Sequence, residues 1–489
     1  MIKNIKWLFL VSLTFIACND DEIVTYDTAD GLPLTAGTAD FSKYVALGDS
    51  YAAGFSDGAL FIEGQKGSYP NILAQQFALV GGGVFTNPFM ADNIGGFSSG
   101  GVQIPSFGPR LYFNGAAPVT VSGISGTSIS DKLTGSFNNM GIPGAKSFHL
   151  DFVGYGSSLG NPYFARFAST PGATVVSDAL AQNPTFFSLW IGGNDVLGYA
   201  LTGGDGTNPI TSTITFTGAY NSLISKMTSG GRKGVIANLP YVTTLPHFKT
   251  VPYNPVPLDA ATVTQLNSLA AYGAYNAGIT QAFAYLVATN KMTQADADAE
   301  KAMRTITFRA GAGNAVVIMD EYLTNLTGIN PALISMRQAT AEDLIVLPAS
   351  SFIGTTVGGD VTKVNGVSVP LADKWVLSKN EISELKTATD TYNGIIQAAA
   401  TANDLAFMDA KAVMDELSTT GITVNNYTIN SSFVSGGAFS LDGFHPTPRG
   451  YALIANKFIQ AINAKYGSNL KGVNLANYRI LFPRDAANF

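Results

Sequence analysis

The amino-acid sequence predicts an α/β fold in which polar side chains follow the ends of buried strands. Short apolar runs typical of core strands lie at residues 43–47, 185–190, 234–238 and 405–409. The first two runs lead directly into glycine-containing turns that carry polar side chains. Because ligands bind at the carboxyl edge of open α/β sheets, we expect these turns to line a functional site.

The composition indicates a globular protein and limits its chemistry. The chain has 489 residues, of which 46% are hydrophobic and 13% charged, and this balance excludes an intrinsically disordered protein. The formal net charge is −6 and no cluster of Lys or Arg stands out, so no nucleic-acid partner is expected. A single cysteine, Cys18, excludes an internal disulfide. Only His149, His247 and His445 can supply an imidazole.

The N-terminus has the pattern of an export signal. Residues 1–17 are predicted to be a lipoprotein signal peptide, because basic residues precede an apolar run too short to span a bilayer. The run ends at Cys18 in a sequence that resembles a bacterial lipobox, although Phe15 departs from the usual Leu. Residues 18–40 are expected to be the lipidated Cys and a flexible tether. The alternative is an ordinary secretory signal with an incidental cysteine. We expect no transmembrane helix.

Two motifs follow strand-like runs. In Gly48-Asp49-Ser50 the strand can present the serine hydroxyl at the edge of the sheet, although a polar turn alone has the same pattern. In residues 191–195, Asn194 offers two uncharged N–H donors, which can stabilise an oxyanion. The alternative for Asn194 is a turn residue that bonds its own backbone.

A third motif combines a carboxylate with an imidazole. Asp442 precedes His445 by three residues, and a carboxylate at this spacing can hold the imidazole in the tautomer that a general base needs. A helix is expected directly afterwards, with Thr447 as its N-cap, Pro448 in its first turn and Gly467 as its stop.

In this order, the motifs resemble those of the GDSL/SGNH hydrolase family. Residues 139–145 resemble the glycine block of that family, with Gly144 preferred over Gly141 for the glycine role, and Leu239-Pro240 resembles its fourth block. The resemblance spans about residues 41–465. It implies a three-layer α/β/α sandwich with a mostly parallel, flavodoxin-like sheet.

The resemblance also implies roles for individual residues. Ser50 is expected to be the nucleophile, His445 the general base and Asp442 the group that orients His445. The expected oxyanion hole consists of the Ser50 and Gly144 backbone N–H groups and the Asn194 side chain.

The other polar residues near these motifs are expected to be structural. Asp49 and Asp195 are interpreted as loop anchors, and His149 and His247 as hydrogen-bonded, partly buried side chains. No histidine spacing indicates a zinc site, so no metal or other cofactor is predicted.

Outside the motifs, residues 41–489 are predicted to be one hydrolase domain with insertions near 80–135 and 258–375. The first insertion is expected to pack on the body as loops, or else to form a lid or the wall of an acyl pocket. Within the second, residues 258–330 are predicted to be largely helical and residues 361–369 to be a hairpin with an Asn-Gly turn.

Two further helices are predicted from their end signals. One covers residues 71–79, and the other begins at the capping box Ser378–Glu381 and ends near residue 402.

Tyr51 stands where the family commonly has Leu, and we do not expect this difference to prevent catalysis.

The expected function is that of a secreted, lipid-anchored serine ester hydrolase acting on acyl or lipid esters. Its partners are expected to be the ester substrate and a membrane reached through Cys18, on the periplasmic or cell-surface face of the outer membrane. Alternatives are a polysaccharide O-deacetylase of the same family, a non-catalytic surface binding protein on this scaffold, and an accessory protein for lipid transfer or uptake.

Overall fold

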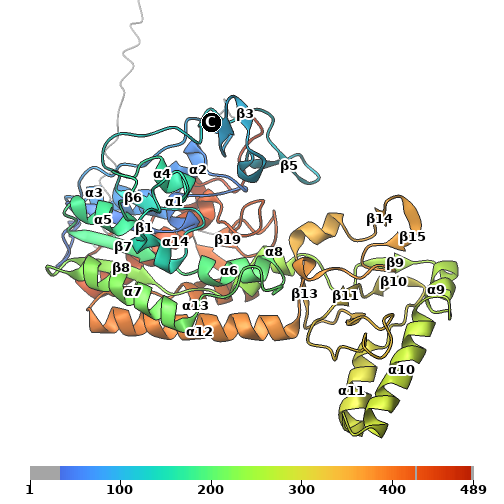
Figure 1. The fold of residues 1–489 in the computed structure, drawn as a ribbon. Helices are drawn as coiled ribbons and strands as arrows, with labels where there is room; N and C mark the ends of the chain where they lie inside the picture. The colour runs from blue at the N-terminus through green and yellow to red at the C-terminus, as the bar shows by residue number, and fades with distance from the viewer. Residues whose placement is uncertain (1–32, 425–426, 486–489) are drawn as a thin grey trace, which may run out of the picture.

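The computed structural model describes residues 33–424 and 427–485, so the predicted signal peptide and Cys18 lie outside the described residues. Five parallel strands form the central sheet in the order β17-β8-β7-β1-β6 (Figure 1). Their bounds are Tyr44–Gly48 for β1, Asn139–Gly141 for β6, Phe186–Trp190 for β7, Lys233–Ala237 for β8 and Ala406–Met408 for β17. All four predicted core strands are therefore confirmed.

Helices cover both faces of this sheet. On one face α3 (Tyr69–Ala78) packs against α14 (Pro448–Tyr466). On the other, α7 (Thr213–Thr228) packs between α5 (Val175–Ala181) and α12 (Lys379–Ala402). This three-layer arrangement with a parallel sheet confirms the predicted α/β fold.

Aromatic side chains join the sheet to the α3–α14 layer. Tyr44 of β1 and Phe186 of β7 both contact Phe77 of α3, and Trp190 contacts Phe458 of α14. Successive strand residues point to opposite faces, so Val45, Phe187 and Leu189 face the other helical layer. All three are fully buried. The strands are buried on both faces, as expected of a parallel sheet.

The predicted helix ends are largely confirmed. Thr447 caps α14 by accepting the Gly450 N–H at 3.0 Å, and Gly467 ends the helix with φ 68°. At α12, Glu381 accepts the Ser378 N–H at 2.5 Å in the predicted capping box. Helix α3 begins two residues earlier than expected.

The remaining short helices surround the carboxyl edge of the sheet. Helix α1 (Ser50–Ala53) follows β1 and α6 (Asn194–Leu201) follows β7. Helices α8 (Pro246–Lys249) and α13 (Ala410–Thr419) come after β8 and β17, respectively. Two more, α2 (Ile62–Lys66) and α4 (Pro162–Ala165), lie in the connections around β6.

The segment of residues 80–135 consists of loops and two small hairpins. One hairpin pairs β2 (Ser98–Ser99) with β3 (Val102–Gln103), and the other pairs β4 (Leu111–Phe113) with β5 (Pro118–Thr120). The segment contacts the body through Phe97, which is fully buried and whose ring lies 4.8 Å from that of Tyr163.

Much of the second predicted insertion forms a lobe beside the sandwich (Figure 1). It contains α9 (Ala260–Leu266), α10 (Tyr272–Ala288) and α11 (Gln294–Arg304). After residue 304 the lobe continues as short strands, so the largely helical prediction holds only for its first part. The strands pair as β9 (Val256–Leu258) with β10 (Gly311–Asn314), and β11 (Val317–Met319) with β12 (Met336–Gln338). A third pair joins β13 (Leu344–Ile345) to β16 (Val376–Leu377).

The predicted hairpin at residues 361–369 is wrong. Strand β15 (Asp360–Val364) pairs instead with the preceding β14 (Thr356–Val357), through a turn at Gly358-Gly359 in which both glycines have positive φ. Outside the sheets, β18 (Ile422–Val424) pairs with β19 (Tyr427–Ile429). Among the described residues, no helix combines the length and the apolar character needed to cross a membrane.

Gly141 of β6 sets how closely α1 approaches the sheet. A Cβ atom at Gly141 would lie 2.2 Å from the Ala53 backbone nitrogen. We expect Gly141→Ala to lower the free energy of unfolding by about 3 kcal/mol, because backbone atoms would have to move. Urea denaturation measures the change.

Gly144→Ala is the matched control for this prediction. Gly144 has φ 79° but no atom within 4 Å of the position of a Cβ, so only the backbone cost of about 1 kcal/mol is expected. Equal losses in the two variants would contradict the role assigned to Gly141.

Candidate active site

Ser50 lies at the carboxyl end of the central strand β1, at the first position of α1. The preceding Asp49 caps this helix, since its Oδ1 accepts the Tyr51 N–H at 3.0 Å. Gly54 ends the helix with φ 82°. The short turn fixes Ser50 with 8% of its surface exposed, and the N–H groups of a first helical turn have no partner within the helix.

Asn194 begins α6 at the end of β7, next to β1. Its Nδ2 donates to the Ala145 carbonyl at 3.0 Å, which ties α6 to the loop after β6. The neighbouring Asp195 is buried and accepts both the N–H of Ser147 at 2.7 Å and its hydroxyl at 2.8 Å. Asp49 and Asp195 are therefore the loop anchors that the sequence predicted.

The predicted oxyanion glycine, Gly144, is in that same loop. It is exposed, has positive φ and precedes Ala145, whose carbonyl Asn194 binds. Gly141 is instead buried in β6 and packs on α1. Of the two glycines, Gly144 is therefore the exposed one, and it directly precedes the residue that Asn194 binds.

Asp442 and His445 form a closely held pair. His445 Nδ1 lies 2.8 Å from Asp442 Oδ2. Asp442 also accepts the backbone N–H groups of Gly58, Phe444 and His445 at 2.8–2.9 Å. Burial alone opposes ionisation of Asp442, but the facing imidazole and these hydrogen bonds outweigh it and lower its pKa to about 2. With Nδ1 directed at a carboxylate, Nε2 of His445 is left to exchange protons with a substrate.

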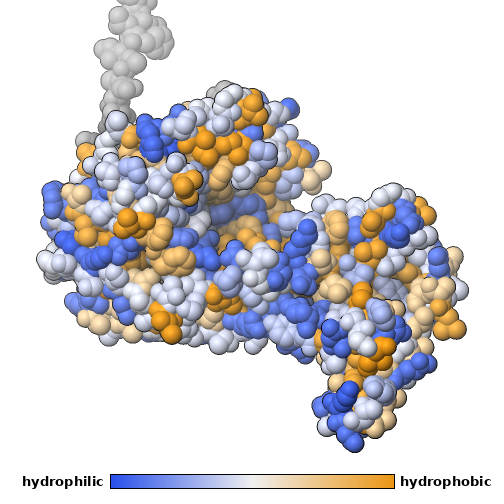
Figure 2. All heavy atoms as spheres, in the orientation of Figure 1, coloured by the Kyte–Doolittle hydropathy of each residue, from blue (hydrophilic) through white to orange (hydrophobic). Residues whose placement is uncertain are grey.

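One pocket brings three of the predicted residues together, while the predicted Gly144 is not among the residues that line it. Ser50, Asn194 and His445 line the same cavity, which encloses about 520 Å³ including its mouth. Asp442 lies behind His445, outside the lining. In Figure 2 the surface is hollowed above α6, the helix whose first turn lines this pocket. Within the described residues Ser50 Oγ has no hydrogen bond to His445, a separation common before substrate binds.

Aromatic side chains that the sequence did not assign to the site surround His445. The rings of Phe55 and Tyr51 lie 4.6 and 5.7 Å from its imidazole. The Tyr51 hydroxyl donates to the Phe444 carbonyl at 2.7 Å, so the residue after Ser50 holds the loop of His445. Only the unusual Tyr51 after Ser50 signalled this contact in the sequence.

The other two histidines lie outside the pocket lining. His149 Nδ1 accepts the Lys146 N–H at 3.1 Å, as predicted for a structural histidine. His247 is buried and stacks on Phe444 at 4.0 Å. Its Nδ1 has no hydrogen-bond partner among the described residues, but its ring has a hydrogen bond with the Asp442 backbone, as expected of a structural histidine. Burial lowers the pKa of His247 to about 4. Neutral His247 therefore supports the loop of Asp442 and His445 through its ring stacking and through its backbone N–H, which donates to the Gly443 carbonyl at 3.1 Å.

The described residues also contain no group of three His, Cys, Asp or Glu side chains arranged to hold a metal ion.

Comparison with known proteins places this geometry in a family. A family model described as GDSL-like lipase/acylhydrolase matches residues 44–458, which is most of the chain. The protein therefore belongs to that family, and membership supports a hydrolase. No curated protein matches the chain significantly.

A second carboxyl, that of the buried Asp57, lies against the Asp442 loop. Its pKa is shifted in the opposite direction to that of Asp442. Its Oδ1 accepts the Leu441 N–H at 2.9 Å, while Oδ2 has no hydrogen-bond partner among the described residues. Burial raises the pKa of Asp57 to about 7. Folded protein therefore keeps this proton at pH values where unfolded chain has lost it.

We expect this proton to make stability fall as pH rises. Between about pH 4 and 7 the native state binds more protons at Asp57 than the unfolded state, so the free energy of unfolding decreases by at most about 1.4 kcal/mol per pH unit. Asp57→Asn removes this dependence and gains stability relative to the wild type toward pH 8. Urea denaturation at pH 4.5, 6 and 8 measures it, with exposed Asp298→Asn as control. Parallel curves for wild type and Asp57→Asn would contradict the assignment.

Proposed function

We propose that this protein is a serine hydrolase of carboxylic esters, with Ser50 as nucleophile. The observation that carries the proposal is the pocket that Ser50, Asn194 and His445 share, with Asp442 2.8 Å behind the imidazole. Acyl transfer requires a hydroxyl, an imidazole oriented by a carboxylate, and an amide donor, all at one site.

In the first half of the reaction, Ser50 Oγ attacks the ester carbonyl carbon while His445 Nε2 takes the hydroxyl proton. The carbonyl oxygen becomes an oxyanion, held by the backbone N–H groups of Ser50 and Gly144 and by Asn194 Nδ2. One such donor contributes about 3 kcal/mol in the transition state. Collapse expels the alkoxide, which leaves as an alcohol with the proton from His445, and the acyl group stays on Ser50.

In the second half, water replaces the alcohol. His445 takes a proton from the water as its oxygen attacks the acyl carbon, and the same donors hold the new oxyanion. The bond to Ser50 Oγ then breaks, His445 returns the proton to Oγ, and the carboxylic acid is released. Asp442 stays ionised throughout and stabilises the imidazolium, in line with its low pKa.

Hydrolysis of p-nitrophenyl esters tests this proposal. We expect turnover by the protein from Asn19 onward, and a loss of about 10⁴-fold or more in kcat for Ser50→Ala, since the nucleophile is absent. Ser229→Ala, at an exposed residue after α7, is the matched control and keeps full activity. Turnover that survives in Ser50→Ala, in protein that is folded by circular dichroism, would refute the assignment of the nucleophile.

We further propose that the enzyme is exported and anchored through a lipid on Cys18. The sequence pattern before Cys18 supports the anchor. Residues 33–39 attach at the amino edge of the sheet, where Thr38 accepts from Lys233 Nζ at 2.5 Å and donates to the Tyr466 carbonyl at 2.8 Å. The pocket is at the opposite, carboxyl edge.

The anchor predicts incorporation of labelled palmitate into the full chain. We expect Cys18→Ser to abolish the label and to release the protein into the soluble fraction, because the thiol that carries the diacylglycerol is missing. Membrane-bound, labelled Cys18→Ser protein would rule out this attachment site without affecting the proposed esterase activity.

A further inference from the structure

A second pocket lies beside the catalytic one along the carboxyl edge of the sheet. The catalytic pocket is at the ends of β1 and β7, and the second pocket is at the ends of β8 and β17, between α13 and α14. It encloses about 500 Å³ including its mouth.

The two pockets share a wall. Tyr51, Trp190, Pro240 and Leu245 line both of them. Pro446, which directly follows His445, lines the second pocket. A substrate whose ester bond lies at Ser50 therefore has the second pocket on the other side of this shared wall.

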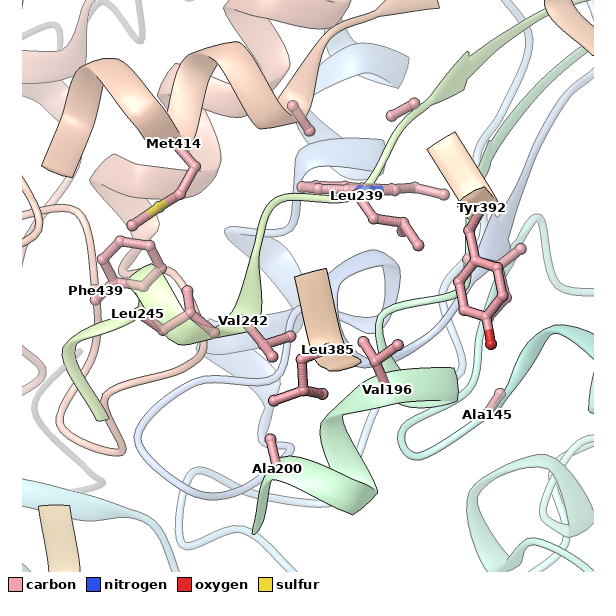
Figure 3. Packing of buried hydrophobic residues seen from close by; sticks show 14 of the residues in the cluster. Ala145, Val196, Ala200, Leu239, Val242, Leu245, Leu385, Tyr392, Met414 and Phe439 are labelled. Atoms are coloured by element: carbon pink, nitrogen blue, oxygen red, sulfur yellow. The ribbon is translucent and has the colours of Figure 1, made fainter. Parts of the chain in front are cut away.

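The lining of the second pocket is almost entirely apolar. Met414 of α13 and Phe439 are buried and point toward one another beside Leu245 (Figure 3). The polar atoms of the shared wall are already engaged, since the Trp190 indole N–H donates to the Asn238 carbonyl at 2.9 Å and the Tyr51 hydroxyl to Phe444. The one charged lining residue is the partly exposed Lys457.

The apolar lining of the second pocket determines which kind of ligand it can bind. It offers a sugar few hydrogen-bond partners, whereas an alkyl chain gains from leaving water without needing any. We propose that this second pocket binds an alkyl chain of the ester substrate, so that the enzyme prefers esters with extended alkyl chains over acetyl esters of polysaccharides. The inference rests on the proposed esterase function and names its substrate class.

Val413 is the residue that tests the pocket. It lines the second pocket but not the catalytic one, and it is only partly buried on α13, so a larger side chain there fills the pocket with little effect on the core. Val413→Trp is the test variant. Ala412→Trp, exposed on the same helix and outside the lining, is the matched control. Ile454→Trp on α14 gives a second, independent filling of the pocket.

The measurement is kcat/KM for two ester series of increasing chain length. One series varies the acyl group of p-nitrophenyl esters, and the other varies the alcohol of n-alkyl acetates. In wild type and Ala412→Trp we expect kcat/KM to rise about fourfold per methylene in one series until the pocket is full. Val413→Trp and Ile454→Trp lose at least tenfold on octanoyl-length chains and change less than twofold on the shortest ester.

The series that responds identifies whether the chain belongs to the acyl or the alcohol part. Identical chain-length profiles in Val413→Trp, Ile454→Trp and Ala412→Trp, in both series, would overturn the inference while leaving the esterase function intact.

Binding of a fatty acid separates failure of the pocket from failure of the function. The fluorescent fatty acid cis-parinaric acid is titrated into Ser50→Ala protein and into the same protein carrying Val413→Trp or Ala412→Trp. Its fluorescence measures binding. Saturable binding that is lost with Val413→Trp and kept with Ala412→Trp supports the pocket even if no ester is hydrolysed. No binding to Ser50→Ala protein, or equal binding to the Val413→Trp and Ala412→Trp variants, refutes the proposed pocket.

Discussion

Because its five central strands run parallel, each must be followed by a crossover before the chain can enter the next, and every strand therefore ends at the same edge. The turns after β1, β7, β8 and β17 then meet along one line, although they are far apart in the chain. Ser50, Asn194 and Leu239 follow three of these ends. The Asp442 loop joins them because α14 must start at this edge to run back along the sheet.

Within that edge, the facing imidazole and the hydrogen-bond donors set the pKa of Asp442 apart from those of its neighbouring carboxyls. Asp442 is surrounded by three backbone N–H groups, the Ser440 hydroxyl and an imidazole, and it stays ionised. Asp57 accepts a single backbone N–H and its pKa rises to about 7, while burial raises that of Asp49 to about 6. Neighbouring carboxyls at one edge of the sheet therefore have pKa values shifted in opposite directions, and of these three the carboxyl of Asp442 is the one that faces the imidazole.

Sequence reasoning identified the parts of the fold that have local causes. Helix ends were predictable where a cap acts on its own helix, as Thr447 and Gly467 do for α14. The strand ends at Ser50 and Asn194 were predictable because apolar runs stop at glycine turns. The hairpin at β14–β15 was missed because Gly358-Gly359 and Asn365-Gly366 compete as turn signals seven residues apart, and tertiary contacts of the lobe decide between them.

What could not be predicted depends on contacts between distant segments. His247 stacks on Phe444, nearly two hundred residues away in the chain, and nothing near either residue indicates the contact. The second pocket is likewise assembled from the segment after β8 and from α13 and α14, and the apolar residues of these two helices have the spacing of ordinary core helices. Periodicity shows that a face is apolar, but not whether another segment fills the space against it.

Tyr51 connects these levels, and its position explains why a larger residue fits where Leu is common. Its backbone N–H is capped by Asp49, which fixes the turn that carries Ser50. Its hydroxyl donates to the Phe444 carbonyl, which fixes the loop of His445, and its ring lies 5.1 Å from Trp190 in the wall between the two pockets. Leu would supply the wall but not the hydrogen bond. The tyrosine therefore positions the serine and histidine segments relative to each other and bounds the space beside the reacting carbon.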